Sequence, residues 1–299
     1  MAFAKANLNY AKEYSQALAQ AYPYTLYFGA LWSATKPDVK FLNNNTVILP
    51  SLTVKGRSNG DRDTIGSFAR NFNNAEESKT LKTHRTWNTL VHPRDIDETN
   101  HVASIQNITK VMNEEQKFPE MDAEMITALY SLKNALEAVS EDDVLTAANV
   151  LTKFDKMMDK MDEKRVPGSG RLLYVDTYTK TLIDTAKDVV RTSGNSVLGR
   201  TVSRIDEVEV INVPTSVMKS KFNLKADDGF EVATDAKAVK MMLIHPSVVI
   251  PVITYDFAEL GLPSALSQGK YTYFEESFED VFIYNKKHDA IQFYIEKQS

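Results

Sequence analysis

The sequence contains no cysteine among its 299 residues. This absence excludes disulfide bridges, thiolate catalysis, thiolate zinc sites and iron–sulfur clusters. No apolar run approaches the roughly 18 residues that a membrane-spanning helix needs, and the opening residues, MAFAKANLNYAKEYSQ, lack the pattern of a secretion signal. We therefore expect a cytosolic product without membrane contact, whose rigidity comes from packing or from partners.

The chain also lacks an excess of basic residues, since its formal net charge is −5. Proteins that bind nucleic acid tightly concentrate Lys and Arg until the domain is basic. The composition thus allows only weak, non-specific contact with DNA. At 43% hydrophobic and 25% charged residues, the chain is long and apolar enough for one or two packed domains.

Residue constellations typical of enzymes are missing as well. The Gly168-Ser-Gly170 turn has neither the strand-to-helix context of a nucleophile elbow nor the Lys-Ser/Thr pair of a phosphate loop. Asp95 and Asp97 resemble a cation-binding pair, but acids are also favoured at a helix entry. No two histidines have the i, i+4 spacing of a shared metal site; they are His84, His92, His101, His245 and His288. We therefore predict no catalytic, cofactor or metal site.

The first 35 or so residues carry a helical apolar pattern that stops at Pro23 and is followed by an aromatic stretch, Tyr24-Thr-Leu-Tyr27-Phe28. Nothing in this segment makes a core of its own. One interpretation is a terminal helix that docks on its own domain, and the other is an arm that docks on a neighbouring subunit.

Two candidate strands flank a long polar excursion. The first is TVILPSLTV at 46–54, and the second, at 82–92, alternates apolar and polar residues on the strand period. Between them lie turn-forming residues and an Asn-rich piece that begins at Asn71. An excursion of this length without a core is uncommon inside a compact domain, so we expect it to need a partner surface.

The middle of the chain is helical. Apolar residues recur at helical spacing over 102–112 and again over 121–136, with Pro119 between them, which predicts one long bent helix or a close pair. Another helix is predicted from Ser140, a plausible N-cap, to Met161.

Strands and a helix alternate over the rest of the chain, and the last two strands are predicted to form a hairpin. The fold class is therefore α+β. The predicted strands are 172–175, 208–213, 238–245, 271–274, 280–284 and 290–295, with a helix at 179–190.

Charge is distributed unevenly along the chain. Residues 55–94 contain eight basic residues against four acidic ones, whereas residues 95–165 contain sixteen acidic residues against eight basic ones. One interpretation is ordinary solvated surface. The other is a head-to-tail assembly that lays the positive excursion of one subunit over the negative helices of the next. The candidate contact residues are then Arg57, Arg62, Arg70, Glu114, Glu115, Glu120, Asp122 and Glu124.

The order of these elements resembles that of the major capsid proteins of tailed bacteriophages with the Hong Kong 97 fold, in particular short members from phages of Gram-positive bacteria. Each motif is weak alone, but their combination and order are fairly specific and cover nearly the whole chain. They are TVILPSLTVKG with Gly60-Asp-Arg62, Asp95-Ile-Asp-Glu-Thr99, Phe118-Pro-Glu-Met-Asp122, Arg165-Val-Pro-Gly-Ser-Gly-Arg-Leu-Leu-Tyr-Val175, Val213-Pro-Thr, Met242-Leu-Ile-His-Pro246 and Asp280-Val-Phe-Ile-Tyr-Asn-Lys286.

The resemblance implies an N-terminal arm, an extended β-hairpin loop, a peripheral domain with a long spine helix, and an axial domain. It also favours the neighbour-docked arm. The implied ranges are 1–40 for the arm, 41–95 for the loop, 96–140 and 270–299 for the peripheral domain, and 141–269 for the axial domain.

The implied function is non-enzymatic. Copies of the chain would form hexamers and pentamers that close into an icosahedral head around double-stranded DNA, assembled in the host cytoplasm and retained in the virion. Because only a short arm precedes the loop, we expect a separate scaffolding protein, together with a portal protein. Although some relatives form a Lys–Asn isopeptide bond, the sequence gives no way to pair such residues, and we do not predict the bond.

Two alternatives stay open. The first is an encapsulin-like compartment of the same fold, which would enclose a cargo enzyme. The second is a soluble enzyme with an unrecognised carbohydrate or nucleotide site, which predicts a compact monomer or small oligomer. The capsid interpretation predicts that reversing Arg57 and Arg62 to Glu blocks assembly without unfolding the monomer.

Overall fold

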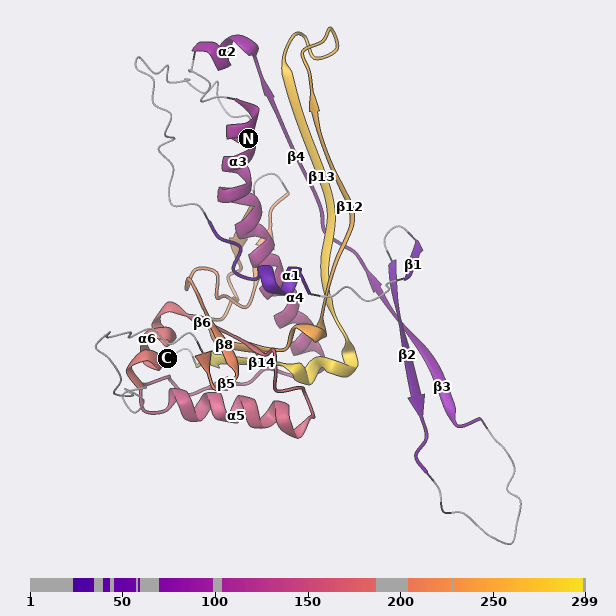
Figure 1. The fold of residues 1–299 in the computed structure, drawn as a ribbon, viewed down its shortest axis with the longest axis vertical. Helices are drawn as coiled ribbons and strands as arrows, with labels where there is room; N and C mark the ends of the chain where they lie inside the picture. The colour runs from indigo at the N-terminus through magenta and orange to yellow at the C-terminus, as the bar shows by residue number, and fades with distance from the viewer. Residues whose placement is uncertain are drawn as a thin grey trace.

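The computed structural model describes residues 24–34, 40–43, 46–57, 59, 70–98, 104–186, 204–226 and 229–297. Within these ranges the chain forms a six-stranded sheet, a long helix with a three-stranded sheet beside it, and a projecting hairpin (Figure 1). No helix in this part of the chain is long and apolar enough to span a membrane. The predicted α+β class is confirmed.

The six-stranded sheet forms the centre of the larger body. Its order is β5 (Glu141–Asp142), β14 (Ile291–Glu296), β11 (Val239–Ile244), β6 (Leu172–Asp176), β8 (Val208–Val213) and β7 (Arg204–Ile205). Helices α5 (Val150–Glu163) and α6 (Thr177–Ala186) bury Phe154 and Ile183 against one face. Every residue of β6 is buried, as expected for a central strand with both faces covered.

A long helical rod runs from Ile105 to Leu136. It consists of α3 (Ile105–Met112), a π-helical turn η1 (Asn113–Lys117) and α4 (Phe118–Leu136). The Ser104 hydroxyl caps its start by accepting a hydrogen bond from the Asn107 amide at 3.4 Å. The predicted interruption at Pro119 takes the form of the wider π turn, because Pro119 has no N–H and its ring would crowd the carbonyl four residues back.

A three-stranded sheet runs beside the rod (Figure 1). Its order is β12 (Val249–Gly261), β13 (Tyr271–Ile283) and β4 (His84–Val91), all antiparallel. The predicted strand at 82–92 is therefore confirmed as β4, and the short helix α2 (Pro93–Glu98), which contains Asp95 and Asp97, follows it. A two-stranded ribbon of β9 (Phe222–Leu224) and β10 (Phe230–Val232) lies near α4.

The hairpin projects away from both sheets (Figure 1). It contains β2 (Thr46–Val54) paired with β3 (Phe72–Thr80) over nine residues, and β1 (Lys40–Asn43) on the other edge of β2. The Asn-rich piece that sequence alone leaves as an irregular excursion is β3 itself. Every β3 residue is exposed or half-buried, so cross-strand pairing with β2 rather than burial holds it extended.

Residues 24–34 are anchored in the chain's own core rather than on a neighbour. Phe28 and Leu31 are fully buried, and the single-turn helix α1 (Gly29–Trp32) lies against the central core. For this stretch, the expectation of an arm docked on another subunit is wrong, because its aromatic residues fill an intrachain site. The predicted helix around Leu8 to Leu18 lies outside the described residues.

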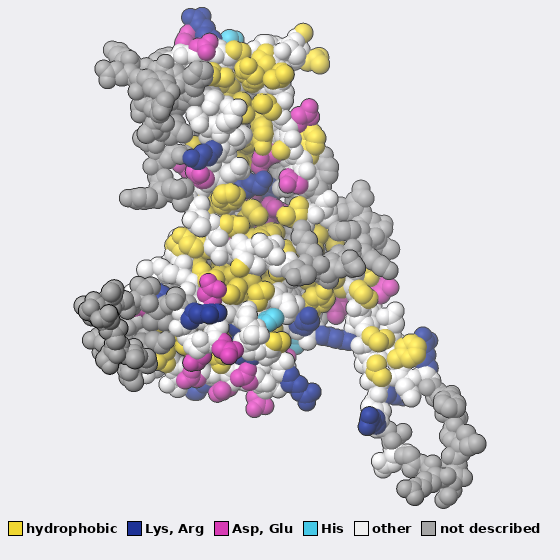
Figure 2. All heavy atoms as spheres, viewed as in Figure 1, with side chains coloured by type: hydrophobic (Ala, Val, Ile, Leu, Met, Phe, Trp, Pro, Cys, Tyr) yellow, Lys and Arg dark blue, Asp and Glu magenta, His cyan; other side chains and the backbone are white. Residues whose placement is uncertain are grey.

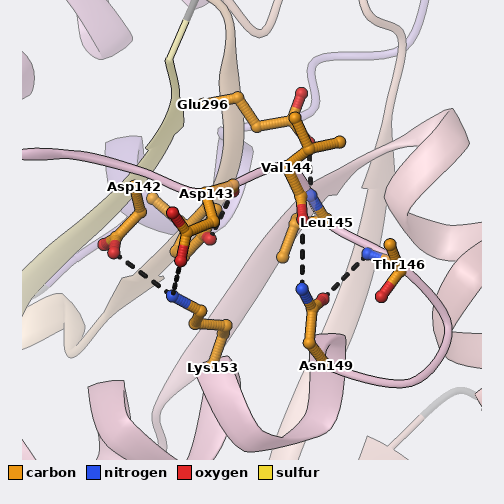
Figure 3. Close-up of polar contacts among 9 residues, drawn as sticks. Asp142, Asp143, Val144, Leu145, Thr146, Asn149, Lys153 and Glu296 are labelled. Carbon is orange, nitrogen blue, oxygen red and sulfur yellow. Dashed lines mark hydrogen bonds and ion pairs between the residues drawn. The ribbon is translucent and has the colours of Figure 1, made fainter.

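The helix predicted from Ser140 begins ten residues later than expected. Residues 141 and 142 pair with β14, and the following turn is tied by side chains, as Figure 3 shows. The Asn149 amide bridges the Val144 carbonyl (3.0 Å) and the Thr146 N–H (2.8 Å). Lys153 then reaches back to Asp142 at 3.3 Å. These contacts satisfy the backbone outside a helix, so α5 starts at Val150.

The predicted C-terminal hairpin is also wrong. Strands β13 and β14 belong to different sheets, and between them lies the 3₁₀ helix η3 (Asn285–Ala290) rather than a tight turn. A second 3₁₀ helix, η2 (Pro246–Val248), separates β11 from β12. Strands β4 and β12 thus share a sheet with β13, whereas β14 belongs to the six-stranded sheet. This grouping differs from the resemblance, which implies that β13 and β14 lie together in the peripheral domain and β12 in the axial domain.

Candidate assembly surface

The base of the hairpin is fixed to the body of the chain. Val47 and Leu49 of β2 pack against Ile250, Val252 and Phe282 in a small apolar cluster. Lys79 of β3 donates a hydrogen bond to the Asn285 side chain at 2.8 Å. These contacts fix the direction in which the hairpin leaves the body.

The distal half of the hairpin carries apolar side chains that are mostly exposed. Leu52 is 60% exposed, Val54 65% and Phe72 50%. A two-stranded hairpin is only marginally stable alone, and clustered apolar side chains on an exposed surface mark interaction sites. We call Leu52, Val54 and Phe72 the distal apolar patch. The hairpin is therefore built to be completed by another surface.

Two of the three predicted basic contact residues border this patch. Arg57 and Arg70 are exposed, and the Arg70 guanidinium lies 4.7 Å from the centre of the Phe72 ring. The third residue, Arg62, lies outside the described residues. Figure 2 shows apolar side chains beside basic ones along the described part of the hairpin. It thus combines apolar area with positive charge.

One predicted acidic contact residue, Glu120, is paired inside its own chain. Its carboxylate accepts two hydrogen bonds from Arg85 of β4, at 2.6 and 2.8 Å. Arg85 also donates to the carbonyls of Lys225 and Gly229, so it joins the rod, the three-stranded sheet and the ribbon. The positive and negative segments of the sequence therefore partly neutralise each other within one subunit.

Asp122 is another predicted contact that the fold uses internally. It is completely buried and accepts hydrogen bonds from the Tyr24 hydroxyl (2.8 Å) and from the amides of Tyr27 (2.9 Å) and Phe28 (3.0 Å). Burial raises the pKa of Asp122 to about 6, although these three donors favour its charged form. Asp122 anchors the N-terminal segment, so its assignment to a surface contact is wrong.

Glu124 is also buried, so it too is wrongly placed among surface contacts. It lies on α4, which contacts β13 of the three-stranded sheet, and its Oε1 atom has no hydrogen-bond partner among the described residues. Burial, with the negative charge of Glu279 as the next cause, raises its pKa well above the ordinary value. Only Glu114, which lies 3.9 Å from Lys110, and the exposed Glu115 remain accessible among the predicted acids.

Known proteins resemble this chain in structure and not in sequence. No family model and no curated protein matches it. The capsid structure of cyanophage P-SCSP1u matches with a TM-score of 0.71 at 12% identity, over 97% of this chain and 94% of that one. The mature capsid of bacteriophage PhiM1 gives 0.68 at 13% identity, over 97% and 92%. A chain of Mycobacterium phage Che8 gives 0.67 at 12%, over 96% and 97%.

The chain has the Hong Kong 97-type capsid fold. Nearly complete coverage of both chains in each comparison means that the rod, both sheets and the hairpin all belong to the shared architecture. The match at 12–13% identity also accounts for the absence of a sequence-level match, since packing patterns persist where residue identities do not.

Within this capsid fold, the outer face of the three-stranded sheet is a second exposed surface, which sequence reasoning missed. Cross-strand pairing places Leu90, Phe257 and Phe274 on the face turned away from the rod, and all three are exposed. Glu259, paired with Phe274, is exposed on the same face. The alternation along β4 was visible in the sequence, but which face would be covered depends on the rod.

One group of side chains in the described part of the capsid fold has metal-ligand chemistry. Ligand atoms of Glu137, His288 and Asp289 lie within 4.8 Å of one another. Both carboxylates are already paired, however, Glu137 with Lys133 and Asp289 with Lys164 at 3.5 Å. The nearby ammonium groups oppose a bound cation, so we assign no metal to this group.

Proposed function

We propose that the chain is the major capsid protein of a tailed bacteriophage, a non-enzymatic shell subunit that assembles with copies of itself. The observation that carries this proposal is the hairpin. It is fixed at its base by Val47 and Leu49, and its described distal half carries the exposed distal apolar patch. An isolated subunit gains little from such an element, whereas a shell repeats the contact at every subunit.

The acceptor on the neighbouring copy is the peripheral sheet and rod. Leu90, Phe257 and Phe274 on the outer sheet face match the apolar side chains of the hairpin, and the exposed Glu259 matches Arg57 and Arg70 in charge. Such pairing fixes the register and discriminates against wrong partners. Glu114 and Glu115 on the rod remain proposed contacts of the same kind.

The proposed domains follow the sequence ranges with the strands reassigned. Residues 1–40 form the arm, of which 24–34 pack on the chain's own core, and the hairpin forms the extended loop. The rod with β4, β12 and β13 forms the peripheral domain. The six-stranded sheet with α5 and α6 forms the axial domain. Axial domains meet around the centres of hexamers and pentamers, which close into an icosahedral head.

The proposed partners are the chain itself, a scaffolding protein and a portal protein during assembly, and packaged double-stranded DNA. The net charge of −5 supports only weak, non-specific contact with DNA, because a strongly basic inner wall would retain the genome. Assembly takes place in the host cytoplasm, and the product is the virion shell.

Electron microscopy with sedimentation on the full chain, expressed alone and with a candidate scaffolding protein, tests this proposal. We expect closed shells, tubes or free hexamers. A well-behaved monomer or small oligomer in both conditions would overturn it. Shells that enclose a co-purifying enzyme, when a cargo protein is encoded nearby, would favour the compartment alternative instead.

A further inference from the structure

The 3₁₀ helix η3 reaches both long strands of the hairpin with two consecutive residues. Asn285, its first residue, accepts the hydrogen bond that Lys79 of β3 donates at 2.8 Å. Lys286 donates to the Leu52 carbonyl of β2 at 3.0 Å and to the Thr53 hydroxyl at 3.3 Å. Residues more than 200 positions away in the sequence therefore hold β2 and β3 together against the body.

The bonds from Lys286 lie farther along the hairpin than the apolar contacts at its base. Val47 and Leu49 pack in the base cluster, and Leu52 follows them on β2. A strand rises about 3.3 Å per residue, so the Lys286 bonds lie roughly 10 to 17 Å beyond these apolar contacts. Apolar contacts are non-directional, whereas hydrogen bonds require a defined geometry. The cluster therefore fixes where the hairpin is attached, and Lys286 restricts its angle.

The Leu52 carbonyl can accept this bond because it lies on an open edge of β2. Strand β1 pairs with β2 only as far as Ile48. The Lys55 amide donates to the Asn71 carbonyl across the hairpin at 2.8 Å. Since the backbone groups of successive residues alternate between the two edges of a strand, the Leu52 carbonyl points away from β3. Lys286 therefore adds a bond without breaking the pairing of β2 with β3.

The 3₁₀ helix η3 is itself fixed to the body of the chain. Tyr284, just before it, packs against the base cluster, and its amide donates to the Val248 carbonyl at 3.2 Å. Ala290 at its end is buried, and its carbonyl accepts a hydrogen bond from the His245 amide at 3.0 Å. These contacts make η3 the fixed support, so the hairpin is the part that turns when the bonds between them open.

We propose that Asn285 and Lys286 form a latch that sets the angle of the hairpin. With the bonds to Lys79, Leu52 and Thr53 made, the hairpin is held at one angle. With these bonds open, it turns about the apolar cluster at its base, which stays packed. The latch is a property of a single chain, and only the claim that it aims the hairpin at a neighbouring copy rests on the proposed function.

Distances between two spin labels on single full-length chains, measured by pulsed electron paramagnetic resonance, test the latch. The sequence has no cysteine, so Gly56→Cys on the hairpin and Thr152→Cys on α5 supply the only labelled sites. Both positions are exposed, and a Cβ at Gly56 meets nothing within 4 Å. We expect a narrow distance distribution for this parent chain. Lys286→Met should broaden it, and adding Asn285→Ala should broaden it further, because each lost hydrogen bond should raise the fraction of displaced hairpins about fivefold.

Two control variants separate the latch from a general loss of contacts. Lys286→Arg keeps a donor at this position and should retain the narrow distribution. Lys221→Met removes an ammonium group that makes two hydrogen bonds to Asp235, at 2.8 and 3.1 Å, and should leave the distribution unchanged. Because Lys286 is exposed, its substitution should leave the midpoint of thermal unfolding nearly unchanged, which a purely structural role would not.

A double variant with the distance distribution of the parent chain would overturn the latch. Equal broadening by Lys221→Met would overturn it as well. Because the labels are read within single chains, separated by size-exclusion chromatography, the result does not depend on whether copies assemble. Failure of the wild-type chain to assemble would count only against the proposed function.

Discussion

At the scale of single residues, Asp122 shows how acidic residues of the rod serve the fold before they serve assembly. One buried carboxylate satisfies a hydroxyl and two amides from a segment about 95 positions earlier in the chain. The sequence places Asp122 among nearby acids that look equivalent. Burial separates Asp122 and Glu124 from Glu115, and no charge pattern can reveal that difference.

Removing the Asp122 carboxylate should loosen the N-terminal segment. Asp122→Ala leaves three donors without their acceptor, and we expect it to lower the free energy of unfolding by about 3 kcal/mol. Urea unfolding followed by circular dichroism measures this change. Asp159→Ala on the exposed face of α5 is the matched control and should stay within about 0.5 kcal/mol of the wild type. Equal values for the two variants would contradict the anchoring role.

Substitutions in the distal apolar patch should weaken assembly without lowering the stability of the single chain. Leu52→Ser with Val54→Ser removes apolar groups that the single chain leaves mostly exposed, so the free energy of unfolding should change by less than about 1 kcal/mol. Assembly, measured by light scattering, should fall strongly. Val144→Ser removes an equally exposed apolar group from outside the hairpin and should assemble normally. Normal scattering from the double variant would remove the patch from the interface.

At the scale of elements, the sequence predicted the helices and strands that follow from local residue periodicity. It missed those that depend on pairing with a distant strand. The rod and the strands β4, β6, β8 and β11 follow from periodicity. Strand β12, which contains Pro251, was not predicted. β12 lies at the edge of its sheet, so the missing N–H of Pro251 need not interrupt the hydrogen bonds between strands. Strand β3 was read as a loop because its Asn-rich sequence has low β-propensity, and only β2 makes it extended.

The π turn in the rod offers a test at this scale. Five residues of π turn advance the helix by about the same rotation as four residues of α-helix, so deleting Glu115 should convert the turn into ordinary α-helix and leave the facing of α3 nearly unchanged. Ile105, which is buried, should then keep its site, and we expect a change of less than about 1 kcal/mol in the free energy of unfolding, measured by urea unfolding followed by circular dichroism. Glu115→Ala keeps the chain length and should also be nearly neutral. A deletion variant about 2 kcal/mol less stable than Glu115→Ala would contradict this role of the turn.

At the scale of the whole molecule, charge complementarity is divided between folding and assembly. The sequence separates a positive stretch from a negative one, and the structure uses part of that contrast within one chain, through Arg85 and Glu120. Of the predicted contact residues that the structure describes, Arg57, Arg70, Glu114 and Glu115 remain accessible, and Glu259 on the sheet joins them. The head-to-tail hypothesis therefore survives with fewer residues than the sequence suggested.

Sedimentation velocity of the full chain beside two hairpin variants tests the central claim most directly. Arg57→Lys with Arg70→Lys keeps the charge, whereas Arg57→Glu with Arg70→Glu reverses it. We predict fast-sedimenting assemblies for the wild type and the Lys variant, and a folded single chain for the Glu variant. A wild-type chain that sediments alone, or a Glu variant that assembles like the wild type, would contradict assembly through the hairpin.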